Sequence, residues 1–148
     1  MTLTHDNDSF EGGIQIDSGT LYIASEGNLG YGAVTLGGGK LAITAAAIMS
    51  DSVSFTFTGD ATIETAADVT FSGTVSGNYS MTKTGAGTLT LSNANNEAGW
   101  SGDIVLTEGT LSISNDNALS SGSLLFNGGR LGATGSTTID NAMSMGVN

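Results

Sequence analysis

Strand-like segments return at a fixed interval in the second half of the chain. GTLTLS and GTLSIS each alternate apolar and polar residues with the two-residue period of a β-strand. Leu91, Leu111 and Leu131 are separated by equal intervals of about 20 residues, and Ile104 and Leu124 share this spacing. We therefore expect each strand to return to the same lateral position after one circuit, with Leu111 stacked between Leu91 and Leu131. Such a return is typical of a solenoid coil and not of a hairpin meander.

The segment 81–131 resembles a known repeat. It reads KTGAGTLTLS, then an Asn-rich loop, an aromatic-x-Gly step at Trp100, a strand, EGTLSIS and NGGRL. This order of motifs is similar to the passenger-associated repeat of Gram-negative autotransporters, and a weaker likeness covers 10–44. The resemblance implies a right-handed parallel β-helix that is exported across two membranes and displayed on, or released from, the cell surface.

Residues 1–44 form a second copy of the same motif. When 12–44 is aligned with 102–134, no gap is needed and 12 of 33 positions are identical. The identical residues are mostly turn glycines and alternating apolar residues, which a coil needs in order to close and pack. The chain is therefore predicted to be one repetitive domain with repeat copies at 1–44 and 91–134.

The segment 45–80 departs from this pattern. The interval from Leu41 to Leu91 is not a multiple of the spacing above, so the coils here must be tighter or carry a corner insert. Three tighter coils of about 17 residues would fit. ITAAAIM (43–49) could form a helical turn but is short and uncapped, whereas the later TTID predicts a strand. The fold class is predicted to be all-β, a right-handed single-stranded parallel β-helix of about seven coils. It would span 1–148 as a single segment with irregular coils at 45–80, and would be a fragment of a longer passenger.

The charge balance argues against several classes of partner. The net charge is −11, and the Lys and Arg residues are Lys40, Lys83 and Arg130. Three scattered cations cannot form the basic patch that nucleic acid or an anionic membrane surface requires. No run approaches the roughly 20 apolar residues of a membrane helix, so we expect no direct membrane insertion by this segment. The absence of cysteine fits the export that the resemblance implies.

Residues that support catalysis are sparse. His5 is the single histidine, which argues against a Ser–His–Asp triad and a histidine-based metal site. Asp103 with Glu108 and Asp17 with Glu26 are candidate carboxylate pairs for a glycosidase, but they do not recur at equivalent positions of the two copies. The loops HDNDS and SNDN match neither an EF-hand nor a calcium β-roll repeat, which favours turns over a calcium site. We expect no catalytic residue, no cofactor and no metal.

Four aromatic residues are candidate binding residues. Phe10 and Trp100 occupy equivalent places before the turn glycines, where an aromatic ring either caps the core or stacks on a sugar. Tyr22 and Tyr31 have no equivalent in the other copy and are expected on the surface. The core-capping alternative is favoured for the first two.

The sequence thus predicts a structural or adhesive β-helix stalk module without catalysis of its own. The resemblance implies a secreted or surface-displayed autotransporter passenger on the extracellular side of a Gram-negative outer membrane. Two alternatives stay open: a carbohydrate-active β-helix enzyme of glycosidase or lyase type, and an adhesin that binds glycan or protein directly. We expect a host-surface protein or glycan as partner. We also expect weak end-to-end self-association, because a solenoid exposes unpaired strand edges on its terminal coils.

Overall fold

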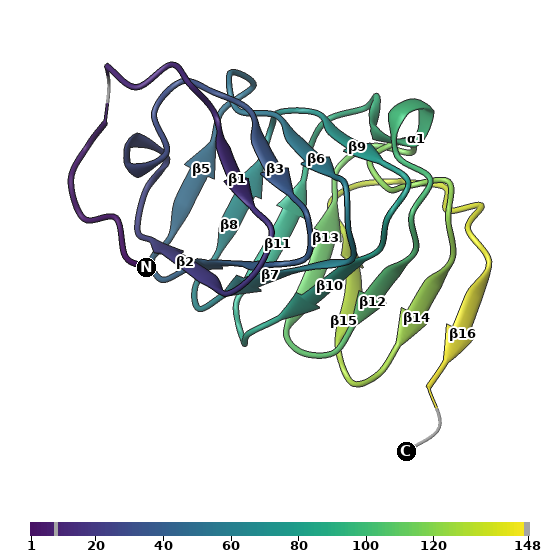
Figure 1. Ribbon diagram of the computed structural model, residues 1–148. Coiled ribbons are helices and arrows are strands. Elements are labelled where there is room, and N and C mark those ends of the chain that lie inside the picture. Colours follow the sequence, from purple (N-terminus) through teal and green to yellow (C-terminus); the bar gives the residue numbers. More distant parts are fainter. Residues whose placement is uncertain (8, 147–148) are drawn as a thin grey trace.

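The chain folds into a solenoid of stacked parallel strands. The computed structural model describes residues 1–7 and 9–146, and Figure 1 shows the strands stacked from the N-terminal to the C-terminal end. These residues form a four-strand sheet (β1-β3-β6-β9), a seven-strand sheet (β2-β4-β7-β10-β12-β14-β16) and a five-strand sheet (β5-β8-β11-β13-β15). The elements are β1 Ile14–Ile16, β2 Thr20–Ile23, η1 Glu26–Asn28, β3 Val34–Leu36, β4 Lys40–Ile43, β5 Ala47–Met49, β6 Phe55–Phe57, β7 Ala61–Thr65, β8 Val69–Phe71, β9 Val75–Gly77, β10 Met81–Thr84, β11 Thr88–Leu91, α1 Asn96–Gly99, β12 Ile104–Leu106, β13 Thr110–Ile113, β14 Leu124–Phe126, β15 Arg130–Ala133 and β16 Met143–Met145.

A complete coil passes the four-strand, seven-strand and five-strand sheets in turn. Ile104 pairs with Leu124 and Lys83 pairs with Leu106, so one circuit takes about 20 residues or a few more. The seven-strand sheet has a strand in every coil, which confirms the predicted all-β solenoid of about seven coils. In the described part of the chain the helical segments are η1 and α1, and neither is long or apolar enough to cross a membrane.

The predicted stacking of Leu111 is half right. Leu111 pairs with Leu131 as expected, but its partner on the other side is Leu89, and Leu91 pairs with Ile113. The coil between β11 and β13 is therefore longer than the coil between β13 and β15, because α1 and the Asn-rich loop before it bulge from the stack. A constant spacing of about 20 residues therefore places the partner of Leu111 one inward-facing residue too far along β11.

The middle coils are full length. Ala47 pairs with Val69, and Val69 pairs with Leu89, so neither of these coils is shorter than the one from Ile104 to Leu124. The prediction of tighter coils is wrong because Leu41 lies in the seven-strand sheet whereas Leu91 lies in the five-strand sheet. Their spacing therefore does not span a whole number of coils.

Two short segments were considered separately in the sequence. ITAAAIM, for which a helical turn was one alternative, contains the end of β4 and the whole of β5, because β5 pairs with β8. The prediction of a strand at TTID is wrong. TTID (137–140) forms no strand, and β16 follows it at Met143–Met145.

The two sequence copies occupy different faces of the solenoid. β1 and β2 align with β12 and β13, yet β1 lies in the four-strand sheet and β12 in the seven-strand sheet. β2 lies in the seven-strand sheet and β13 in the five-strand sheet. Equivalent strands of the two copies therefore lie four coils apart along the solenoid and in adjacent sheets around it. Equivalent loops consequently project in different directions.

Inward side chains form columns along the axis. One column of the seven-strand sheet includes Leu21, Leu41, Ile63, Lys83, Leu106 and Phe126. Alternation places these residues on the inner side of their strands, where their burial drives folding. A lysine interrupts this otherwise apolar column.

A glycine makes room for an aromatic stack in the core. Phe57 pairs with Gly77, and Gly77 bridges to Trp100 on the following coil. Because Gly77 has no side chain, the rings of Phe57 and Trp100 stack with centroids 5.6 Å apart and planes inclined by 9°. The Trp100 ring nitrogen donates a hydrogen bond to the Tyr79 carbonyl at 3.2 Å.

Candidate functional site

A polar cavity opens where the four-strand sheet ends. Beyond β9 the chain passes this face as loops, namely α1 with its flanks and the segments 115–121 and 136–141. The cavity measures about 380 Å³ and extends across these three loops. Its lining residues are Glu97, Asp116, Asn117, Leu119, Ser120, Ser121, Thr138, Asp140 and Asn141.

One carboxylate from each loop makes this cavity acidic. Glu97, Asp116 and Asp140 are all exposed. Asp116 Oδ1 accepts the backbone N–H of Thr138 from the next coil at 2.8 Å, so this carboxylate also ties two coils together. The described residues contain no group of three His, Cys, Asp or Glu that could hold a metal ion.

These three acids were not predicted as a site from the sequence. A signal was present, because the interval from Glu97 to Asp116 and the interval from Asp116 to Asp140 are both close to one coil length. The acids lie in loops rather than in alternating strands, so strand periodicity does not place them on one face. Only the stacking of the loops brings them to one cavity.

The predicted pair Asp103 and Glu108 does not converge on a common site. Asp103 Oδ1 accepts the N–H of Ser123 at 2.8 Å, and Glu108 Oε2 accepts the N–H of Gly85 at 3.1 Å. Each carboxylate therefore bonds to the backbone of a neighbouring coil. Both residues are exposed, as expected for acids at the corners of coils.

The second predicted pair is likewise divided between separate contacts. Asp17 accepts hydrogen bonds from the Gln15 amide at 2.8 and 3.0 Å. Glu26 Oε1 accepts the Ser50 N–H at 3.1 Å and also the Ser50 hydroxyl. His5 is exposed. None of these contacts joins a carboxylate to another acid or to the histidine.

The four candidate aromatic residues divide into two groups. The Tyr31 N–H donates to the Phe10 carbonyl at 2.8 Å, so these residues lie on neighbouring coils, 60% and 42% exposed respectively. Tyr22 lies on β2 and is 41% exposed. Trp100 is only 1% exposed, so its ring is not presented to solvent. Trp100 thus caps the core, which was the favoured alternative for this residue.

An apolar cavity of about 490 Å³ lies at the N-terminal end. Inward side chains of the first coil, Ile14, Ile16 and Leu21, line it together with Leu3 and Phe10. Within the stack, such side chains are covered by the next coil. Ile16 and Leu21 are themselves buried, so the cavity lies against the end of the apolar core without opening these two side chains to solvent.

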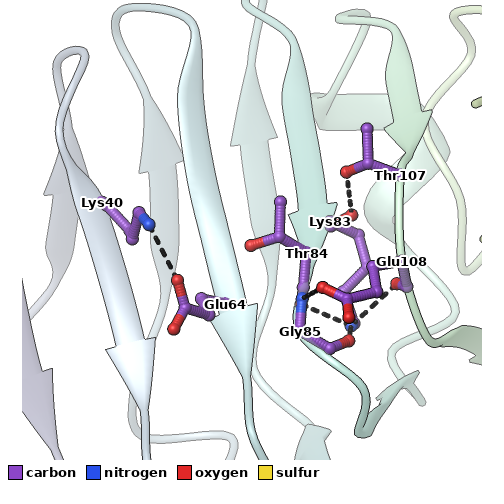
Figure 2. A network of polar contacts seen from close by, with 7 residues as sticks. All are labelled: Lys40, Glu64, Lys83, Thr84, Gly85, Thr107 and Glu108. Atoms are coloured by element: carbon purple, nitrogen blue, oxygen red, sulfur yellow. Dashed lines mark hydrogen bonds and ion pairs between the residues drawn. The ribbon is translucent and has the colours of Figure 1, made fainter.

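The three Lys and Arg residues lie in different environments. Lys40 Nζ pairs with Glu64 Oε2 at 2.7 Å on the outer side of the seven-strand sheet (Figure 2), and this hydrogen-bonded carboxylate raises the pKa of Lys40. Arg130 is exposed at the start of β15. Lys83 is fully buried, and burial lowers its pKa to about 8. The expectation of three scattered cations did not anticipate this difference, although alternation places Lys83 on the same side of its strand as Met81.

Sequence comparisons relate this chain to known proteins. A family model described as the passenger-associated-transport-repeat matches residues 1–23 and 81–113. The adhesin BmaC autotransporter of Brucella suis biovar 1 (strain 1330) is 36% identical over 115 residues, which cover 76% of this chain and 3% of that protein. No solved structure matches the chain. The repeat match and this relative together confirm the resemblance seen in the motifs: the chain is an autotransporter passenger repeat protein.

Proposed function

We propose that this chain is a non-catalytic stalk module of an autotransporter passenger. The observation that carries the proposal is the seven-strand sheet, which continues from β2 to β16 without a missing strand. Each inner strand is hydrogen-bonded on both sides, so neighbouring coils resist separation along the whole stack. Such a stack is suited to hold another domain, or its own loops, at a distance.

The proposed location is the extracellular side of a Gram-negative outer membrane, with the passenger displayed there or secreted. The family match and the relative named as an adhesin support this location. The chain spans only 3% of that relative, so the match does not identify a partner of the whole protein. We propose a host-surface protein or glycan as the partner of the passenger.

A binding assay separates a passive stalk from a direct adhesin. We expect the purified chain to bind host cells and a glycan array no more strongly than a variant with Phe10→Ala, Tyr22→Ala and Tyr31→Ala. These three rings are the exposed members of the candidate set, and their removal leaves the core residue Trp100 in place. Saturable binding by the wild type that the triple variant loses would show that this segment is itself adhesive.

The acidic cavity favours one alternative, a carbohydrate-active β-helix enzyme. Glu97, Asp116 and Asp140 line one cavity, and a pair of carboxylates is the usual machinery of glycoside hydrolysis. Against this, Asp116 already accepts a backbone N–H, and all three side chains are exposed. The alternative requires that Glu97→Gln or Asp140→Asn abolish a hydrolase activity of the wild type.

We also propose weak end-to-end self-association of this chain. The apolar cavity lies at one end, and at the other end Met143 and Met145 on β16 are 52% and 79% exposed. Among the described residues, no strand pairs with the outer edge of β16, so this edge is free to pair with a strand of another copy. The charge of −11 opposes contact between copies, so association should increase from about 10 mM to about 150 mM salt as the Debye length shortens. Sedimentation at both salt concentrations measures it, and a strict monomer in both would contradict it.

A further inference from the structure

Lys83 occupies a place in the core that its neighbours fill with apolar side chains. It lies in β10 between Ile63 of β7 and Leu106 of β12, and it is 0% exposed. Among the charged residues that the structure describes, it is the buried one. A buried charge requires close polar partners to offset its lost hydration.

Three backbone carbonyls supply those partners. Lys83 Nζ donates to the carbonyl oxygens of Thr84 at 2.7 Å, Gly85 at 2.8 Å and Glu108 at 3.3 Å (Figure 2). An ammonium group has three N–H donors, so its number of donors matches the number of carbonyls. Thr84 and Gly85 belong to the same coil as Lys83, whereas Glu108 belongs to the next coil. The amine therefore joins two coils.

Glycine turns shape this site. Gly85 and Gly109 have φ values of +77° and +69°, which place both in the left-handed region. A Cβ atom on Gly109 would lie 3.0 Å from Lys83 Nζ and 2.3 Å from the Gly85 carbonyl oxygen. The Glu108 carboxylate closes the outer side by accepting the Gly85 N–H at 3.1 Å. The carbonyls are thus fixed by turns that a larger residue would disturb.

We propose that this corner is a recognition site for a primary amine, filled by the chain's own Lys83, and that the filled site fixes the register of the coil containing β12 and β13 on the preceding coil. Lys83 is a positioning residue in this role. Its pKa of about 8 leaves it an ammonium at pH 7, where all three N–H groups can donate. A buried polar contact of this kind is well suited to set register, because a shifted coil moves the Glu108 carbonyl away and leaves one of the three N–H groups of the buried ammonium without a partner.

The experiment is a chemical rescue of Lys83→Ala. This substitution removes the atoms that n-propylammonium would replace. We expect the variant to lose about 5–10 °C in Tm at pH 7, because charge-assisted hydrogen bonds are lost. Added n-propylammonium chloride should raise that Tm in a concentration-dependent manner. Tetramethylammonium chloride at the same concentration has no N–H donor and should not.

Lys83→Met is the matched control because it retains an apolar stem and has no amine. It should lose nearly as much Tm as Lys83→Ala and show no rescue, since its side chain fills the space. If Lys83→Ala is unfolded at the outset, recovery of folding by n-propylammonium serves as the same readout. The proposal is overturned if Lys83→Met is as stable as the wild type, or if the two ammonium salts affect Lys83→Ala equally.

Discussion

Leu111→Asp is expected to lower the free energy of unfolding by about 3–5 kcal/mol, which is a large share of the roughly 5–15 kcal/mol that stabilises a domain. Leu111 is 0% exposed and lies between Leu89 and Leu131 in the five-strand sheet. A carboxylate in this apolar column loses its hydration. Urea denaturation followed by circular dichroism measures the loss.

Thr110→Asp is the matched control for this prediction. Thr110 is the preceding residue of the same strand, is partly exposed, and pairs with Arg130 on β15. A carboxylate at this outward position keeps its hydration and lies beside a cation, so it should cost less than about 1 kcal/mol. Equal losses for the two substitutions would refute the assignment of Leu111 to the inside and of Thr110 to the outside.

The solenoid could be predicted because its signals are local and repeated. Alternation fixes which residues of a strand face inward, and turn glycines separate the strands. The pairs Leu111–Leu131 and Ile104–Leu124 followed directly from the equal spacing of these residues. Each coil buries its inward side chains in the same way, so the repeat length found in one part of the chain predicts the fold of the rest.

Coil register could not be predicted as well, because loops change coil length without changing the strands. The bulge at α1 lengthens its coil and shifts the partner of Leu111 from Leu91 to Leu89. The face that a strand occupies is also not marked in its sequence. TLYI of β2 and TLSI of β13 are alike, yet they lie in different sheets.

The candidate site was harder to predict than the fold. Glu97, Asp116 and Asp140 come together only because three loops of unequal length stack over one another. The burial of Lys83 follows from alternation, but a lysine in an inward position contradicts the usual preference of charged residues for the surface. Its carbonyl partners are backbone atoms, which leave no mark on residue identity apart from the turn glycines.

Trp100→Ala is expected to lower the free energy of unfolding by about 3–5 kcal/mol. The ring is 1% exposed and stacks on Phe57 through the space left by Gly77. Truncation leaves a cavity beside Phe57. It also leaves the Tyr79 carbonyl, which accepts the indole N–H in the wild type, without this partner. The loss should be large because the stacked coils on either side restrict relaxation into the cavity.

Phe10→Ala provides the matched comparison, because Phe10 aligns with Trp100 when the two sequence copies are superposed. Phe10 is 42% exposed and lies against the apolar cavity at the N-terminal end, so its truncation should cost about 1 kcal/mol or less. The two residues differ because Trp100 follows a coil in which Gly77 opens a slot for its ring, whereas Phe10 lies on the first coil of the stack. Thermal or urea unfolding of both variants measures the two losses of stability. Equal losses would mean that alignment of the copies, and not the Gly77 slot, determines what these aromatic side chains contribute.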